Sequence, residues 1–307
     1  MTFGAGMDID VVCVGMVTPA EVYVVDEIPE WNTGSKWNSR ADFVSDDAAI
    51  VATNLATWGL KAGLICNNFG EDLAGHNLLA ELEDIGLTGE FLLDSSLRTP
   101  YEIVISDSYG GRTYIWDRRD DVLKTLFKAS TGLIARTKYC YFDWYDLPYI
   151  FPAIRDAKSN DVPVFFNIED KFNDSEIMSV ASEYATYVQA NSSDLDSVDS
   201  MRNIAELLIS KGVLVAIVTG ASKGCFVSDG VDSFIVRPPA VRVVDANGAG
   251  AVLSAGLMYG ICHDWNLRDA CKFAVAAASK KCESVGPRFG AFDQALSLAK
   301  ELDLSSA

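Results

Sequence analysis

The stretch that decides the fold is Val243-Val244-Asp245-Ala246-Asn247-Gly248-Ala249-Gly250-Ala251, which joins a strand-like run to an apolar run over residues 252–261 that is typical of a helix. Its small residues allow the backbone to approach an anion, and the first N–H groups of the helix point at that anion. The stretch therefore predicts a phosphate-binding loop. A phosphate-transfer site needs an acid at the end of such a loop, where this chain has Ala251.

Length and charge restrict the class of protein. A chain of 307 residues is long enough for one large α/β domain or two smaller ones. Its net charge of −18 argues against nucleic acid and anionic membrane surfaces as partners. The seven cysteines form no C-x-x-C pair, and there is no run of 18 apolar residues. We expect a cytoplasmic protein with reduced thiols.

From residue 139 onward, strand, loop and helix patterns alternate. This alternation predicts a mainly parallel sheet covered by helices on both faces. Ligands bind such sheets beyond the carboxyl ends of the strands. That rule selects the segments 18–20, 67–70, 143–144, 167–169, 191–194, 219–224 and 245–251.

A second pattern, richer in polar residues and aromatics, covers residues 31–44 and 101–117. The spaced aromatics in the first segment favour a half-exposed antiparallel sheet. The second segment alternates on either side of Tyr109-Gly110-Gly111, which predicts a hairpin. The two segments together predict a small separate sheet, whose interface Trp31, Trp37 and Trp116 fill.

The order of the elements, the Gly-Ala-Gly loop and several spacings resemble the PfkB (ribokinase-like) carbohydrate kinase family over about residues 8 to 303. The resemblance implies a three-layer α/β sandwich, with residues 1–307 as one domain and lid segments at about 20–44 and 99–119. It also implies ATP and Mg²⁺ as cofactors, a sugar or nucleoside as the second ligand, and a homodimer formed through the β lid.

The family signature is Asp-Thr-x-Gly-Ala-Gly-Asp, and residues 245–251 match it at Asp245, Gly248, Ala249 and Gly250. By resemblance, the N–H groups of residues 249–251 form the anion hole for the transferred phosphoryl group. Asp245 is expected to order the loop or the metal shell. Ala246 and Ala251 depart from the signature, and the final Asp is the family's catalytic base.

Most of the family motifs that border the nucleotide have recognisable counterparts in this sequence. Asn191-Ser192-Ser193-Asp194 resembles the Asn-x-x-Glu element that orders Mg²⁺ through water, so Asp194 is the candidate metal residue. Residues 219–224 resemble Thr-x-Gly-x-x-Gly beside the nucleotide, which assigns Thr219, Ala221 and Gly224 to it. Residues 281–286, ending at Gly286, resemble the stretch beside the adenine.

The substrate side departs from the family pattern. Ala20 stands where the family has a hydroxyl-binding Asp. Residues 45–50, which include Asp46, Asp47 and Ile50, replace a Gly-Gly-x-x-x-Asn run. The two acids are good helix caps. Trp144, after a strand's carboxyl end, either stacks on a ligand or packs internally. Arg118 either touches a phosphate or, as we favour, lies in a solvated salt-bridged turn.

Three explanations for Ala251 stay open. A methyl group cannot accept a proton, and loss of a positioned base costs roughly 10²- to 10⁴-fold in rate. The chain is a pseudokinase that has lost its activity, an Asp→Ala variant of an active kinase, or an active kinase with another acid as base. The departures at Ala20, Asp46 and Ile50 favour the first. A dinucleotide-binding oxidoreductase is set aside, because no Gly-x-Gly-x-x-Gly follows the first strand.

Overall fold

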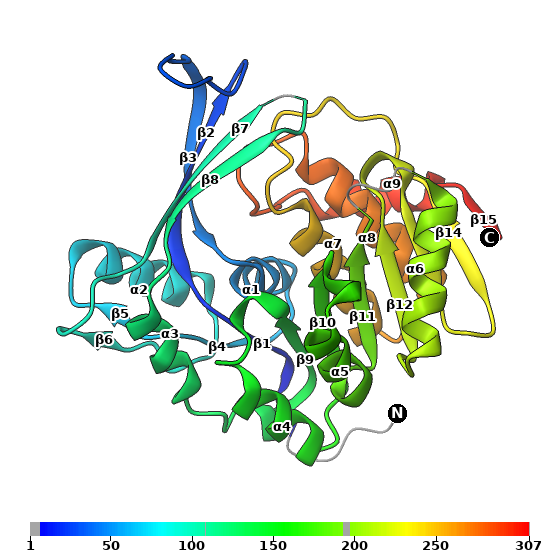
Figure 1. The fold of residues 1–307 in the computed structure, drawn as a ribbon, viewed down its shortest axis with the longest axis horizontal. Coiled ribbons are helices and arrows are strands. Elements are labelled where there is room, and N and C mark those ends of the chain that lie inside the picture. Colours follow the sequence, from blue (N-terminus) through cyan, green and yellow to red (C-terminus); the bar gives the residue numbers. More distant parts are fainter. Residues whose placement is uncertain (1–6, 108, 193–196, 307) are drawn as a thin grey trace.

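A nine-stranded sheet forms the centre of the molecule in the computed structural model, which describes residues 7–107, 109–192 and 197–306 (Figure 1). Its strand order is β15-β14-β13-β12-β11-β10-β9-β1-β4. The strands from β12 to β4 are parallel, and β13, β14 and β15 join antiparallel at one edge. The bounds are β1 (Ile9–Val14), β4 (Ala62–Ile65), β9 (Thr137–Asp143), β10 (Val164–Glu169), β11 (Tyr187–Asn191), β12 (Val215–Thr219), β13 (Cys225–Ser228), β14 (Ser233–Val236) and β15 (Leu304–Ser306).

Helices cover both faces of this sheet, as the alternating pattern predicts. Successive residues of a strand point to opposite faces, so Val11 joins one hydrophobic core and Val12 joins the other. One face carries α1 (Asp47–Thr57), α2 (Leu73–Ile85), α7 (Ala249–Cys262), α8 (Leu267–Lys281) and α9 (Phe292–Glu301). The other carries α3 (Asp120–Phe127), α4 (Phe151–Ser159), α5 (Ser175–Tyr184) and α6 (Val198–Ser210). The predicted three-layer α/β fold is confirmed.

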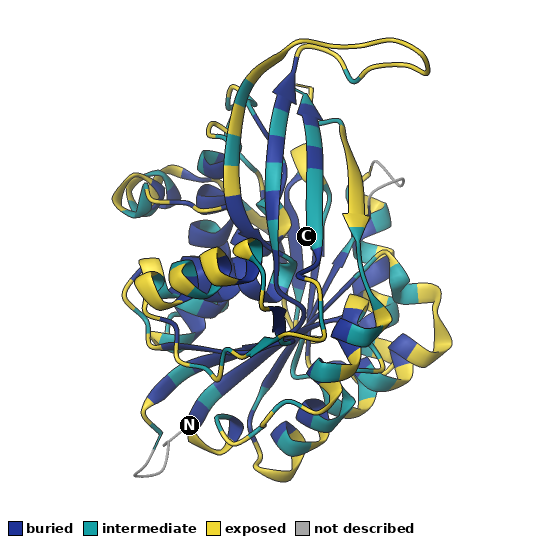
Figure 2. Ribbon diagram, turned by 90° about the vertical axis from the view of Figure 1, so that its left-hand side faces the viewer, coloured by how far each residue is buried: buried dark blue, intermediate teal, exposed yellow. Residues whose placement is uncertain are grey.

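A separate four-stranded sheet, which we call the lid, has the order β3-β2-β7-β8. It consists of β2 (Thr18–Val25), β3 (Trp37–Ser45), β7 (Tyr101–Asp107) and β8 (Arg112–Asp117). Its inner face buries Ala20, Val22, Phe43 and Val104, against which Val285 packs. Figure 2 shows this sheet rising from the body with one edge exposed, consistent with the exposed residues along β8.

The lid's aromatic residues do not all pack as the sequence suggests. Trp31 is 96% exposed, Trp37 55% and Trp116 62% in the single chain. They therefore fill no interface between the lid segments. Helix α3 is not among the predicted elements, although Val122, Leu123 and Leu126 lie at helical spacing on its buried face, and α2 begins four residues before the expected Asn77.

Helices α7 and α8 pack closely because small residues face each other. A Cβ atom at Gly256 would lie 2.6 Å from the Cα atom of Ala274. A Cβ atom at Gly260 would lie 2.6 Å from Cβ of Ala270. This contact fixes the direction of α7, and with it the position of the residues 245–251 that precede and begin the helix.

A small two-stranded sheet pairs β5 (Phe69–Gly70) with β6 (Leu93–Asp94). None of the described helices combines the length and the apolar character that crossing a membrane would require. All seven cysteines are free, as expected.

Candidate functional site

Asp245 lies at the centre of a buried hydrogen-bond network. Its side chain is fully buried. Oδ1 accepts a hydrogen bond from Ser106 Oγ at 2.8 Å and another from the backbone N–H of Asn247 at 2.9 Å. Oδ2 accepts one from the N–H of Gly286 at 2.9 Å. One carboxylate therefore ties together the lid, the predicted phosphate loop and the segment after α8.

Lys281 is the charged partner of Asp245. It is also fully buried, and its Nζ donates to the Asp245 carbonyl oxygen at 2.7 Å and lies 3.4 Å from Oδ2. Burial lowers the pKa of Lys281, and the charge of Asp245 opposes that shift. A buried lysine of this kind places a positive charge directly behind the loop.

The loop presents the N-terminus of α7 with little side-chain cover. Gly248 has a φ of 74°, and a Cβ atom there would lie 2.4 Å from Cβ of Pro287, so the position requires glycine. Gly250 is exposed, and no described residue outside its own helix and chain neighbours lies within 4 Å of its Cβ position. The N–H groups in the first turn of this 14-residue helix suit an anion, although that of Ala249 also donates to the Ala246 carbonyl oxygen at 3.3 Å.

Ala251 is the third residue of α7, and its methyl group is buried in the hydrophobic core. On the adjoining helix, Ile50 comes close to the loop: its Cδ1 atom lies 3.6 Å from the Cβ position of Gly248. The structure thus brings the first turn of α1 against the loop.

The expected nucleotide residues lie at the carboxyl ends of neighbouring strands. Asn191 ends β11 and pairs in register with Thr219, which ends β12. Ala221 has a φ of 46° and Gly224 a φ of 108°, both in the left-handed region. Asp194, the candidate metal residue, falls outside the described residues. Within the described residues, no group of three His, Cys, Asp or Glu side chains could hold a metal ion.

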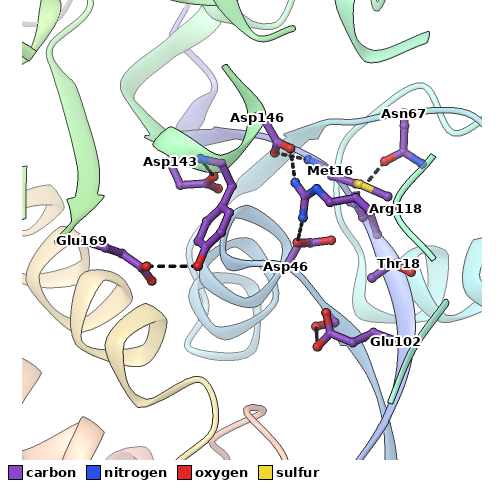
Figure 3. Close-up of polar contacts among 12 residues, drawn as sticks. Met16, Thr18, Asp46, Asn67, Glu102, Arg118, Asp143, Asp146 and Glu169 are labelled. Carbon is purple, nitrogen blue, oxygen red and sulfur yellow. Dashed lines mark hydrogen bonds and ion pairs between the residues drawn. The ribbon is translucent and has the colours of Figure 1, made fainter. Parts of the chain in front are cut away.

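Arg118 is held between two carboxylates, in contrast to the exposed turn that the sequence favours (Figure 3). Its Nη1 lies 2.7 Å from Oδ1 of Asp46, and its Nη2 pairs with Oδ1 of Asp146. The Arg118 side chain is only 22% exposed, and Asp146 is 1% exposed. The Met16 N–H donates to Asp146 Oδ2 at 2.6 Å. The predicted solvated turn is wrong because partners 72 and 28 residues away bury this guanidinium.

Asp46 does not cap α1 as expected. It is the N-cap residue, with a φ of 73° and a ψ of 145°, and among the described residues its side chain bonds no N–H group of the helix. Its Oδ2 atom is buried and has no hydrogen-bond partner there. The carboxylate is directed at Arg118 instead, so the ion pair takes precedence over the cap.

Asp47, the first residue of α1, accepts a hydrogen bond from Asn167 Nδ2 at 3.0 Å. Burial raises its pKa to about 7, and the charges of Glu169 and Asp46 add to the rise. Burial likewise raises the pKa of Glu102 to about 7, with a contribution from Asp46. Burial is also the main reason that the pKa of Asp146 rises to about 6. Burial thus raises the pKa of several carboxyl groups near the start of α1 toward neutral pH.

Trp144 stacks on Tyr145 with ring centroids 4.3 Å apart, and Lys171 lies 4.7 Å above the Trp144 ring. Tyr145 donates from its hydroxyl to Glu169 at 3.2 Å. Internal packing and ligand stacking both remain open for Trp144. Ala20 lies on the lid's inner face and contributes only a buried methyl group there.

The sequence analysis misses Ser106, Lys281, Asp146 and the buried role of Arg118. Lys281 carries a usable signal, because it follows Ala274, Ala277 and Ala278 at helical spacing on a buried face. Ser106 and Asp245 are 139 residues apart, and no local pattern links them.

Comparisons with known proteins agree with this architecture. The sequence profile of the pfkB family carbohydrate kinases matches residues 47–294. A protein named as an uncharacterized sugar kinase of Archaeoglobus fulgidus is 24% identical over an alignment of 252 positions that covers 77% of this chain and 97% of that protein.

The solved structures that share the fold include two kinases. The ribokinase of Thermotoga maritima superposes with a TM-score of 0.76 at 18% identity, covering 95% of this chain and 99% of its own. The nucleoside kinase of Burkholderia thailandensis, solved with inosine, has a TM-score of 0.78 at 16% identity, covering 95% of this chain and 97% of its own.

Proposed function

Because this chain belongs to the pfkB family of carbohydrate kinases, we propose that it binds ATP at the 245–251 loop and transfers phosphate to a sugar or nucleoside weakly or not at all. The observation that carries the first half is the N-terminus of α7, where Gly250 is exposed and has open space around its Cβ position, so an anion can approach the backbone. Asn191, Thr219, Ala221, Gly224 and Gly286 would line the nucleotide.

Mg²⁺ would enter with the nucleotide, bound to its phosphates. Magnesium sites commonly take one or two protein carboxylates and complete their shell with phosphate oxygens and water. The described residues offer no set of three acidic or thiol ligands, so no step is assigned to a resident metal. Asp194 stays a candidate for water-mediated contact.

Ala251 carries the second half of the proposal. By the family signature this is the position of the base, and here it is a buried methyl group. The N–H groups of residues 249–251 would still stabilise charge on the transferred phosphoryl group. The attacking hydroxyl would keep its proton, and the rate would fall by roughly 10²- to 10⁴-fold.

One observation favours the alternative of an active kinase with a different base. Asp47 lies at the start of α1, and the same helix contacts the loop through Ile50. With a pKa near 7, raised first by burial, Asp47 is suited to accept a proton at neutral pH. Ala20 and Asp46 would belong to the substrate side in either case.

The deciding experiment combines binding and turnover. We expect MgATP to raise the melting temperature, and a panel of sugars and nucleosides to give ADP release no faster than the ATPase background. Substrate-dependent turnover well above background would overturn the loss of activity. If Asp47→Asn then abolished it, Asp47 would be the base. Absence of any nucleotide shift would overturn the whole proposal.

Ala251→Asp tests what else has changed. Substrate-specific turnover in this variant would mean that the remaining site is intact and that residue 251 alone limits the wild-type protein. No gain, in a variant that still binds MgATP, would assign the deficit to the substrate side around Asp46 and Ile50.

We also propose a homodimer through the lid. Trp37 and Trp116 are more than half exposed in the single chain, as is Ile115, and a second copy would cover such apolar side chains. Size-exclusion chromatography with light scattering should give twice the monomer mass for the wild type. The Trp116→Glu variant should give the monomer mass. A monomeric wild-type protein at micromolar concentration would refute the dimer.

A further inference from the structure

The lid touches the 245–251 loop at two points, both through side chains. Ser106 on β7 is fully buried, and its hydroxyl donates to Asp245. Tyr114 on β8 donates from its hydroxyl to Asn247 Oδ1 at 3.1 Å. These strands are antiparallel neighbours, and Figure 1 shows them reaching toward the segment that leads into α7. Both contacts fall on loop residues that precede the anion-binding N–H groups.

The Asp245 carboxylate divides its hydrogen bonds between the lid and the loop. Oδ1 accepts hydrogen bonds from both the Ser106 hydroxyl and the N–H of Asn247. Oδ2 accepts one from the N–H of Gly286 and is paired with Lys281 Nζ. Hydrogen bonds to a buried charge are stronger than those between neutral groups, and members of such a network depend on one another. A change at Ser106 is therefore felt at Asn247 and at the start of α7.

A second lid surface reaches the other side of the same network. Val285 packs against the lid's inner cluster, and Cβ of Ala41 lies 3.9 Å from the Cβ position of Gly286. The N–H of Gly286 is itself bonded to Asp245. The lid thus braces both segments that Asp245 connects, and Asp245 is the point where these contacts meet.

We propose that Ser106 is a positioning residue that acts through Asp245 on the phosphate-binding loop, so that lid contact and phosphate affinity are linked. The linkage is reciprocal: phosphate bound at residues 249–251 strengthens the lid's hold on the loop, and a lid that has moved away weakens phosphate binding. The inference rests on the proposed nucleotide binding for its ligand. Its structural part, the coupling of lid to loop, stands without a ligand.

The test compares Ser106→Ala with Ser106→Thr, which keeps the hydroxyl, and with Thr113→Ala, an exposed change on the neighbouring strand. Calorimetric titration with MgATP, MgADP and AMP reads the affinity. We expect Ser106→Ala to lower the affinity for MgATP about tenfold and the affinity for AMP less than twofold. AMP is less affected because it lacks the phosphates that reach the loop. Ser106→Thr should bind MgATP more tightly than Ser106→Ala, because it keeps the hydroxyl, and Thr113→Ala should match the wild type. Equal losses for MgATP and AMP, or none, would overturn the proposal.

Hydrogen–deuterium exchange separates this inference from the proposed function. Amide protons of residues 247–252 should exchange about tenfold faster in Ser106→Ala than in the wild type or Thr113→Ala, with or without nucleotide. If the wild type binds no nucleotide, the proposed function fails, and the exchange rates alone decide the coupling. Unchanged exchange in the Ser106→Ala variant would refute it.

Discussion

Asp46 has a φ of 73° and a ψ of 145°, a region that residues other than glycine rarely occupy. Ala221 also has a positive φ, of 46°. By the resemblance described above, both residues occupy positions where the family pattern has glycine. The surrounding structure enforces these conformations. At Asp46, the ion pair with Arg118 offsets part of the cost.

This strain can be measured with a matched pair of variants. Asp46→Gly and Asp46→Ala both remove the carboxylate, but only glycine relieves the backbone. We expect Asp46→Gly to be more stable than Asp46→Ala by about 1–2 kcal/mol in chemical denaturation. Equal stabilities would show that the backbone relaxes at no cost when the side chain is shortened.

Arg118 is buried between the carboxylates of Asp46 and Asp146, and its charge stabilises them. Arg118→Met leaves the Asp46 and Asp146 carboxylates without their cation, so the free energy of unfolding should fall by about 3 kcal/mol at pH 8. The loss should be smaller at pH 5, because burial raises the pKa of Asp46 and raises that of Asp146 to about 6.

Arg119→Met is the control for Arg118→Met. Arg119 pairs with Asp121 at the surface, where removal of the cation should cost little at either pH. If the two variants were equally stable, or if the cost at Arg118 did not depend on pH, the buried ion-pair cluster would not be the source of the effect.

At the scale of elements, local patterns are sufficient to predict most of the sheet and helices. The Val11–Val14 strand, the helix after residue 48 and the 101–117 hairpin all follow from side-chain spacing. Helix α3 was missed because it has only eight residues, and its acidic first turn looks like a surface turn. The position of the lid against the 245–251 loop could not be predicted, because it depends on tertiary contacts such as the hydrogen bond from Ser106 to Asp245.

The α7–α8 contact gives a prediction for elements. Gly256→Ala should lower the free energy of unfolding by about 1–3 kcal/mol, because its methyl group would overlap the backbone of Ala274. Gly250→Ala in the same helix has open space around the added methyl group, and its stability should stay the same or rise by up to about 1 kcal/mol. Thermal and urea unfolding compare the two, and equal effects would contradict close packing at Gly256.

At the scale of the molecule, the site assembles from segments far apart in sequence. Asn191, Thr219 and the 245–251 loop could be anticipated because strand ends meet at one edge of a parallel sheet. The pairing of Arg118 with Asp46 and the burial of Lys281 against Asp245 depend on how the lid and α8 pack. Helical spacing places Lys281 on a buried face, but no pattern in the sequence identifies its partner or that of Arg118.

Two buried carboxyl groups also predict how stability depends on pH. Burial raises the pKa of Asp47 and of Glu102 to about 7, well above unfolded values near 4. The folded protein therefore binds more protons than the unfolded chain between about pH 4 and 7, and stability falls as pH rises through 7. We expect the melting temperature to drop by about 2–5 °C between pH 5 and pH 8.

The double variant Asp47→Asn, Glu102→Gln isolates this contribution from the general repulsion of an acidic protein. Its melting temperature should change less than that of the wild type between pH 5 and pH 8, when both are measured by calorimetry at constant ionic strength. A steeper dependence in the double variant would contradict the assignment of these protons.

The unusual backbone at Asp46 has a consequence for how this protein can evolve. Any aspartate codon becomes a glycine codon by a single base change, so the sequence with the less strained backbone is one mutation away. That step removes one of the two carboxylate partners of Arg118 and leaves its buried guanidinium paired with Asp146 alone. At residue 46, glycine would give a less strained main chain, and aspartate gives an ion pair with Arg118 at the end of the lid. This chain has the aspartate and therefore the ion pair.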